Sequence, residues 1–248
     1  MAHVAAVDDA AWESPWRVRP VGSRVFLSFA LILTALLTPA WPGCVLVAVI
    51  ALALMLCSAQ IRPSLVALVT VPPILFISVG IIPIAVQVGG TPFFKVTPDG
   101  VATALNVLAH GIAGTLALLL LVTTTTMVDL MGWVRRLRIP GPVLEIAELM
   151  YRLVFVLLST TVAIQQAQQA RLAADAPFRR RMQYAADAMG TVMLRTWDRA
   201  VRLQGGLELR GYEEDLPTLQ PTFQPAGGLM VRNVLLIAAI WAVVWWVA

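Results

Sequence analysis

Charged residues are scarce in this sequence. Asp, Glu, Lys and Arg make up 13% of the 248 residues, whereas hydrophobic residues make up 59% and the mean hydropathy is +0.80. An ordinary soluble domain carries about 25% charged residues, so this composition excludes a soluble globular protein. It predicts an all-α, polytopic membrane protein. The few charges gather in the first 24 residues and in 127–215, and we expect these two regions to be the aqueous parts.

Lysine and cysteine are almost missing. Of the 18 basic residues 17 are arginines, and the single lysine is Lys95, in FFKV. A Walker A loop ends in Gly-Lys-Ser/Thr, which Lys95 does not provide, and neither GxSxG nor HExxH occurs. We therefore predict no catalytic residue and no cofactor, and expect any ATP hydrolysis in a partner. Cys44 and Cys57 stand 13 residues apart in one apolar run, about 20 Å along a helix, which is too far for a disulfide.

Basic residues outnumber acidic ones by four. In a membrane protein this excess is explained by arginines retained on the cytoplasmic side and by contact with anionic lipid. The lipid bilayer is therefore an expected partner and nucleic acid is not. The start of the chain, MAHVAAVDDAAWESPWRVRP, is acidic before its first arginine and lacks the basic beginning of a cleaved signal peptide. We expect it to stay on the protein, with the N-terminus in the cytoplasm.

Five apolar windows are close to the roughly 20 residues that cross a bilayer. They are 23–39, 43–60, 64–87, 101–126 and 229–248. The expected organisation is a cytoplasmic N-terminal tail (1–22), a four-helix transmembrane region (23–126), a cytoplasmic-face module (127–215) and a C-terminal transmembrane helix (229–248).

A sixth window, 141–164, is ambiguous, because it is apolar in its second half but polar in its first. If it crossed the membrane, eight arginines between Arg171 and Arg210 would lie outside. That is the unfavourable side for arginine. We therefore expect 127–215 to lie wholly at the cytoplasmic face.

This cytoplasmic-face module is predicted to hold one short and two long helices. The pattern in MVDLMGWVRRLR (127–138) is typical of a short helix lying in the membrane interface, and prolines end it. The second helix is expected at about 142–173. The third should begin after Pro177, be amphipathic, and run to Arg210, where Gly211 offers a C-cap.

Both long helices end in an arginine that is followed by acidic residues and then proline. The two tips are Ala170-Arg171-Leu172 and Leu209-Arg210-Gly211. Two matching tips indicate a paired docking device whose helices finish side by side, since the guanidinium fork donates several hydrogen bonds and keeps its charge. The alternative is that each arginine caps its own helix, where a cation is favoured by about 0.3–1 kcal/mol.

These residues resemble the transmembrane (T) component of energy-coupling factor (ECF) transporters, in its cobalt-type, CbiQ-like branch. That family carries Ala-Arg-Gly-type motifs at the ends of two long cytoplasmic coupling helices. SPWRVRPVGSRVFLSFALIL is similar to the family's opening, and RIPGPVLEIAELMYRLVFVL, with Arg152, to the start of its first coupling helix. The sequence departs from the motifs at Leu172, which replaces a glycine, and at Leu209, which replaces an alanine.

The resemblance implies a scaffold in the bacterial inner membrane. It would join two ABC ATPase subunits to a separate substrate-binding membrane subunit, the S component. Each arginine tip would sit in a groove of one ATPase subunit, and closure of the ATPase dimer would move the two helices. Cobalt is the implied substrate, with nickel or a vitamin as alternatives.

Two other functions are considered. Glu145, Glu148 and Arg152 are spaced by three and four residues, so they could form the site of a membrane-embedded enzyme or, more simply, a ladder of ion pairs along one helix. A self-contained carrier is disfavoured by the odd number of spans and the lack of an inverted repeat. His110, at membrane depth, is expected to be a packing histidine, and no metal site is expected because cobalt or nickel needs several ligands.

Overall fold

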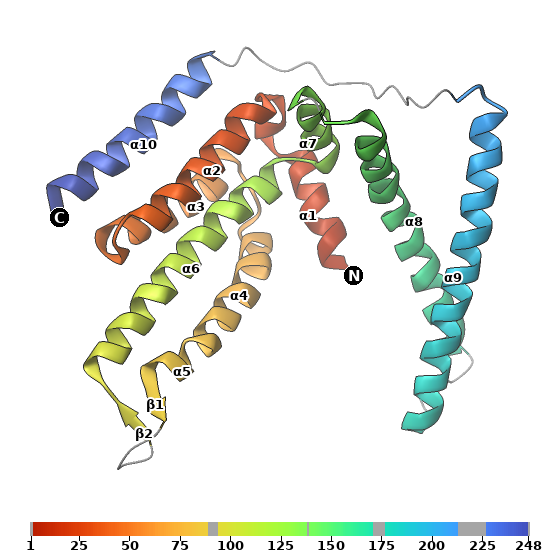
Figure 1. Ribbon diagram of the computed structural model, residues 1–248, viewed down its shortest axis with the longest axis horizontal. Helices are drawn as coiled ribbons and strands as arrows, with labels where there is room; N and C mark the ends of the chain where they lie inside the picture. The colour runs from red at the N-terminus through yellow and green to blue at the C-terminus, as the bar shows by residue number, and fades with distance from the viewer. Residues whose placement is uncertain (1, 89–93, 138, 171–176, 213–226, 248) are drawn as a thin grey trace. The chain divides into compact units, whose positions relative to one another are not determined.

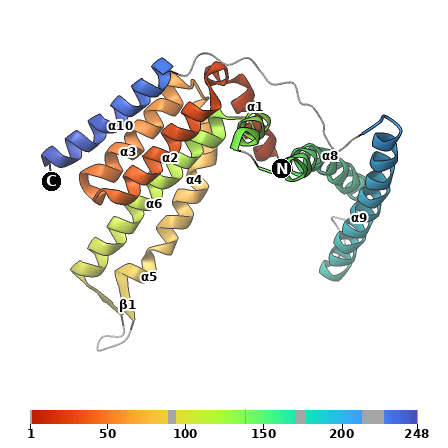
Figure 2. The same ribbon diagram turned by 45° about the horizontal axis from the view of Figure 1, so that its top comes forward.

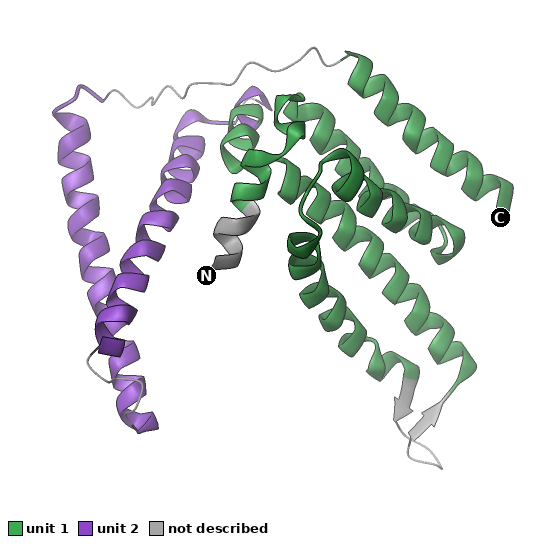
Figure 3. Cartoon of the chain, turned by 180° about the vertical axis from the view of Figure 1, so that it is seen from behind, with its two compact units in different colours: residues 1–133, 220–248 green, residues 134–219 purple. Residues whose placement is uncertain are grey.

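The computed structural model describes residues 2–88, 94–137, 139–170, 177–212 and 227–247. The chain divides into two compact units, shown in different colours in Figure 3. Unit 1 comprises 1–133 and 220–248, and unit 2 comprises 134–219. Helices dominate the described residues, and several of them are apolar and long enough to cross a bilayer. The predicted all-α, polytopic membrane fold is confirmed.

Unit 1 is a bundle of helices, several of them joined by short turns (Figures 1 and 2). In chain order its helical segments are α1 (Ala2–Glu13), η1 (Pro15–Val18), α2 (Val21–Leu37), η2 (Ala40–Cys44), α3 (Val45–Ala53), η3 (Leu54–Ser58), α4 (Pro63–Gly80), α5 (Ile82–Ala85), α6 (Pro98–Thr124), α7 (Met127–Val134) and α10 (Gly227–Val247). The long α6 packs against α2, α3, α4 and α5, so it is the central helix of the bundle.

Local sequence explains where several of these helices begin. Pro63 and Pro98 each occupy the first position of a helix, where a missing N–H costs nothing. The side chain of Thr97 accepts a hydrogen bond from the backbone N–H of Gly100, which caps α6 in the usual way. α4 and α6 therefore begin at prolines, where the start of a helix is favoured.

A small antiparallel hairpin interrupts the helices. β1 (Val86–Val88) pairs with β2 (Phe94–Val96), with Gln87 opposite Lys95. The sequence predicts no strand in this region, because three-residue strands are too short for a pattern of alternating residues to reveal. The hairpin joins α5 to α6.

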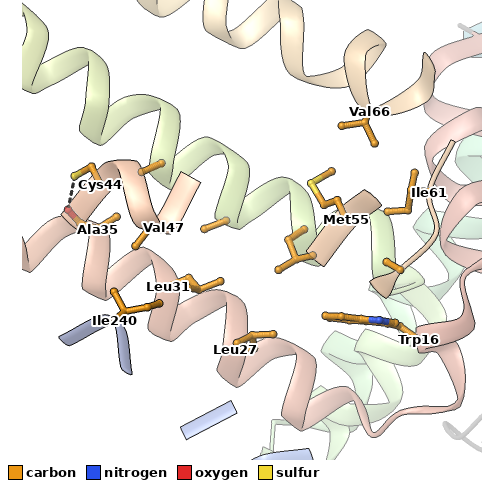
Figure 4. Packing of buried hydrophobic residues seen from close by; sticks show 14 of the residues in the cluster. Trp16, Leu27, Leu31, Ala35, Cys44, Val47, Met55, Ile61, Val66 and Ile240 are labelled. Carbon is orange, nitrogen blue, oxygen red and sulfur yellow. Dashed lines mark hydrogen bonds between the residues drawn. The ribbon is translucent and has the colours of Figure 1, made fainter. Parts of the chain in front are cut away.

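The core of unit 1 is made by side chains from helices far apart in sequence (Figure 4). Leu31 of α2 and Val47 of α3 are fully buried, and Ile240 of α10 is nearly so. On α6 the buried face carries Ala113 and Ala117, and small residues four apart let neighbouring helices approach closely. Packing among α2, α3, α6 and α10 therefore holds unit 1 together.

The first residues of the chain, expected as a tail, form part of unit 1. Trp16 in η1 is 2% exposed and joins the core cluster. Its indole Nε1 donates a hydrogen bond to Ser58 Oγ over 3.0 Å. The apolar windows gave no sign of this, because one tryptophan among polar residues has no periodic pattern.

Five helical segments have the length and hydropathy to cross a membrane: 40–58, 63–85, 98–124, 141–170 and 227–247. This set differs from the predicted one. The predicted first span corresponds to α2, which has 17 residues and so reaches about 26 Å, near the lower limit for crossing. The window that we kept out of the membrane, 141–164, lies within a helix that qualifies. Length and composition do not decide on which side or at what depth that helix lies, so its cytoplasmic placement stays a prediction.

Unit 2 consists mainly of two long helices. After the turn η4 (Arg135–Leu137) come α8 (Gly141–Ala170) and α9 (Phe178–Glu208). The two long helices are therefore present at nearly the expected residues, whereas the predicted short helix corresponds to α7, most of which belongs to unit 1. The third helix ends two residues before Arg210, which is within the fraying expected of a helix end.

Replacing Trp16 by Ala tests whether the N-terminal segment is part of the fold. We expect a loss of about 3–5 kcal/mol of unfolding free energy, as for other buried aromatic residues, measured as a lower unfolding temperature in detergent. Trp245→Ala is the matched control, because Trp245 is 88% exposed. Equal unfolding temperatures for the two variants would contradict the packing described here.

Candidate functional site

The two long helices of unit 2 run antiparallel and are tied at both ends. Near the end of α8, Gln168 Nε2 donates to the carbonyl oxygen of Tyr184 in α9 over 2.8 Å. Beyond the end of α9, the hydroxyl of Tyr212 donates to Glu145 Oε2, near the start of α8, over 2.6 Å. Glu145 is 4% exposed. The end of one helix is therefore held at the beginning of the other.

The Leu209-Arg210-Gly211 tip follows the last turn of α9. Gly211 has a φ of +71°, the left-handed conformation in which glycine commonly ends a helix. The turn that it makes leaves Leu209 91% exposed and Arg210 exposed. The predicted C-cap is confirmed, and it places both side chains on the surface.

The carbonyl groups at the end of α9 are bonded without the side chain of Arg210. Backbone N–H groups already satisfy the last carbonyls of α9: Leu209 donates to Gly205, and Arg210 and Tyr212 both donate to Leu207. No described residue accepts a hydrogen bond or forms an ion pair with the Arg210 guanidinium. The arginine is therefore not needed to cap its own helix, and its charge is presented outward.

The first tip is only partly described. Ala170 is the last residue of α8 and is exposed, whereas Arg171 and Leu172 lie outside the described residues. The expectation that the two rods finish side by side is wrong, since Tyr212 bonds to Glu145, about 25 residues from Ala170 on the same helix. At 1.5 Å per residue that separation is about 38 Å. Antiparallel pairing thus puts Ala170 and the Leu209-Arg210-Gly211 tip at opposite ends of unit 2.

The outer surface of α9 is apolar as well as basic. None of its described residues is buried within the chain. Its most exposed large apolar residues are Phe178, Met189, Met193, Leu194 and Trp197. Flexible methionine side chains adapt well to a partner surface, so this helix is suited to contacts outside the chain.

A second feature, which sequence reasoning missed, is a buried ion pair in unit 1. Arg24 of α2 is 2% exposed and Asp129 of α7 is 4% exposed, and Arg24 Nη2 lies 3.8 Å from Asp129 Oδ2. Arg24 also donates to the carbonyl oxygens of Thr124 and Arg19. From the sequence, Arg24 is placed in the aqueous N-terminal region and is assigned no partner. An aspartate directly after the apolar span 101–126 was the signal that it has a specific partner.

This pair fixes α7 to the rest of unit 1. Thr126 Oγ1 accepts a hydrogen bond from the backbone N–H of Asp129 and so caps α7. A Cβ added to Gly22 of α2 would lie 3.0 Å from the indole Nε1 of Trp133 in α7, so the helix and the glycine are in close contact. The segment that leads along the chain into α8 is thus anchored by charge and by packing.

Glu145, Glu148 and Arg152, the residues of the alternative enzyme site, differ in their exposure to solvent. The carboxylate of Glu145 is buried and bonded to Tyr212, whereas Arg152 is exposed. Glu148 is half-buried. His110 lies on α6, with Nδ1 2.7 Å from the carbonyl oxygen of Asn106 one turn earlier, which matches a packing role. In the part of the chain that the structure describes, no group of three His, Cys, Asp or Glu side chains could hold a metal ion.

The fold and the two features define a multi-pass, all-helical membrane protein with a separate unit of two long antiparallel helices. Residues 13–221 match the family described as CbiQ, cobalt transport protein. The chain therefore belongs to the CbiQ family of cobalt transport proteins.

Several relatives are similar over most of this chain. The cobalt transport protein CbiQ of Rhodobacter capsulatus is 33% identical over 233 residues, which are 94% of each chain. A putative fused cobalt transport protein, CbiMQ, of Methanocorpusculum labreanum is 22% identical over 84% of this chain and 36% of its own length. An uncharacterised protein of Methanocaldococcus jannaschii is 22% identical over 94% of this chain and 88% of its own. The similarity to the first of these relatives covers both units.

Asp129→Ala tests the buried pair. The substitution leaves Arg24 charged and uncompensated in an apolar bundle, and such losses cost about 3–5 kcal/mol, measured as a lower unfolding temperature. The control is Glu13→Ala, which breaks an exposed pair with Arg62 (3.8 Å) and should cost less than about 1 kcal/mol. A combined Arg24→Met and Asp129→Leu variant should recover most of the stability. An Asp129→Ala protein as stable as the wild type would refute the role of the pair.

Tyr212→Phe tests the link between the Arg210 tip and α8. Loss of a hydrogen bond to a carboxylate costs about 1.5–3 kcal/mol, so backbone amides in residues 207–212 should exchange with deuterium at least about ten-fold faster. Tyr184→Phe is the control, because the bond at that position uses the backbone carbonyl of Tyr184 and not its hydroxyl. Unchanged exchange at 207–212 in Tyr212→Phe would show that the tip is held by other contacts.

Proposed function

We propose that this chain is the energy-coupling transmembrane (T) component of an ECF-type ABC importer for cobalt. In this role it hydrolyses no ATP itself. It links two partner ABC ATPase subunits to a separate substrate-binding membrane subunit, the S component. Unit 1 is the membrane scaffold and unit 2 is the coupling module.

The observation that carries the proposal is the outward-facing Arg210 tip on a separate two-helix unit. The guanidinium is not used to cap α9, and the neighbouring Tyr212–Glu145 bond of 2.6 Å holds the tip in place. A fixed cationic fork suits a carboxylate or a helix C-terminus on a partner. Glu145, to which Tyr212 bonds, lies about 38 Å from Ala170 along α8, and this spacing suits two ATPase subunits that each take one tip.

Motion of the ATPases would reach the membrane through α7. If nucleotide-driven closure displaces the tips, α8 and α9 move with them, because the two helices are bonded at both ends. The chain leads from α8 back to α7, which Asp129 and Trp133 fix to α2. A displacement of α8 would thus reach the transmembrane bundle through the contacts that α7 makes with Arg24 and Gly22 of α2.

We place the coupling module at the cytoplasmic face of the bacterial inner membrane, together with the N-terminus. Support comes from the eight arginines between Arg171 and Arg210, which would otherwise lie outside. The apolar surface of α9 would then contact the S component or the membrane surface. Ala170, Arg171, Leu172, Leu209, Arg210 and Gly211 would form the ATPase contacts, and Arg152 would support the first coupling helix.

Cobalt is proposed as the substrate because the relatives with named functions are cobalt transport proteins. Nickel and vitamins are the alternatives for an importer of this type. One of the relatives is described as a fusion, CbiMQ, and this chain matches 36% of its length. A fusion of this kind fits a chain that works beside a second membrane protein, which would hold the metal.

Arg210→Ala tests the proposal. With the ABC ATPase subunits of the same host co-expressed, we expect the variant to retain at least about ten-fold less ATPase in detergent pull-downs, as for an arginine at the centre of an interface. Uptake of labelled cobalt by cells should fall with it. Adding Arg171→Ala should abolish both signals.

Arg202→Ala is the control, because Arg202 is an exposed arginine on the same helix. It should leave association and uptake near wild-type levels. Undiminished ATPase association in the Arg171→Ala, Arg210→Ala double variant would overturn the proposed coupling role.

A further inference from the structure

A small basic hollow lies in unit 1 where α2 and α10 begin. Residues from three segments line it: the end of the N-terminal segment, the first turns of α2 and the first turns of α10. They include Trp16, Arg19, Arg24, Leu229, Arg232 and Asn233. Asn233 Nδ2 donates to the carbonyl oxygen of Ser23 over 2.9 Å, so α10 is fixed to α2 beside the hollow.

Among the described residues that line this hollow, positive charge is in excess. Three arginines line it, and the carboxylate of Asp129 is already paired with Arg24. The guanidinium of Arg19 lies over the Trp16 ring, 4.2 Å from its centroid, and burial, together with the charge of Arg232, lowers the pKa of Arg19. Arg24 is 2% exposed, yet its Nε has no hydrogen-bond partner among the described residues. Like charges and an unpartnered buried donor indicate that an anion completes the site.

The backbone adds to the positive potential. The described first turns of α2 and α10 contain no acidic residue, and no side chain caps the start of α2. Helix N-termini attract anions because their first N–H groups are unpaired and the helix dipole is positive there. Two such termini therefore converge with three guanidinium groups on one place.

The position of the hollow identifies the kind of anion. α10 is long and apolar enough to cross a bilayer and α2 is a shorter apolar helix, so we place their first turns at headgroup depth. Trp16 lines the hollow. In α1, the Trp12 ring lies beneath the guanidinium of Arg17, with 3.9 Å between the guanidinium carbon and the ring centroid. Tryptophan is enriched at headgroup depth. The enclosed space is about 10 Å³, which admits a single oxygen-sized group. A phosphate could insert one oxygen while the rest of its molecule stays outside.

We propose that Arg19, Arg24 and Arg232 form a binding site for the phosphate of an anionic phospholipid headgroup, at the junction of α2 and α10. The lipid would neutralise these arginines and hold the last transmembrane helix to the bundle. The site does not involve the arginine tips, so it is tested independently of the proposed coupling function.

Native mass spectrometry of the full-length chain in a neutral detergent tests the site. Phosphatidylglycerol should bind in preference to phosphatidylcholine. Each arginine near an anionic surface contributes about 1 kcal/mol, so Arg232→Gln should weaken phosphatidylglycerol binding about five-fold, and Arg19→Gln with Arg232→Gln about thirty-fold. Arg232→Lys should retain part of the affinity.

Arg62→Gln is the control, because Arg62 is an exposed arginine of unit 1 that does not line the hollow. It should bind the lipid as the wild type does. Equal binding of the two lipids, or wild-type binding by the double variant, would overturn the proposal. Displacement of the lipid by an equal concentration of inorganic phosphate would show a site for free anions instead. Loss of the lipid when the transporter assembles with its partners would show that the arginines serve a protein contact.

Discussion

The buried pair of Arg24 and Asp129 is the constraint on which the arrangement of this protein depends. An isolated charge in an apolar bundle costs several kcal/mol, so each of these side chains is tolerable only beside the other. Arg24 comes from α2 and Asp129 from α7, and Arg24 also donates to the carbonyl oxygen of Thr124 at the end of α6. The pair thus fixes where three helices meet. It does so at the point from which the chain leaves unit 1 for the two long helices.

Unit 2 differs from unit 1 in that few of its described residues are buried. α9 has no buried residue among those described, and its position beside α8 depends on a few polar bonds at the two ends. Such a unit can respond to partners without disturbing a core of its own. This division into a packed bundle and an open helix pair is the basis of the coupling role that we propose.

Much of the fold followed from local patterns. Apolar windows predicted the long helices, and prolines and Gly211 predicted where several of them begin and end, because chain geometry at these residues is decided locally. The α1 segment, the hairpin and the burial of Trp16 were not predicted, since none has a periodic signature. The side-by-side tips were a wrong inference: two similar helix ends say nothing about direction, and the bond from Tyr212 to Glu145 shows the helices to be antiparallel.

The sequence by itself determined that this is a helical membrane protein and where its long helices lie. Those properties depend on hydropathy and on neighbours within a few turns, which the linear order of residues contains. Tertiary structure alone decided that Arg24 belongs with Asp129, that Glu145 holds Tyr212, and that Asn233 bonds to Ser23. Each of these contacts joins residues at least 67 positions apart, and a contact at such a separation is fixed by the packing of whole helices rather than by any local rule.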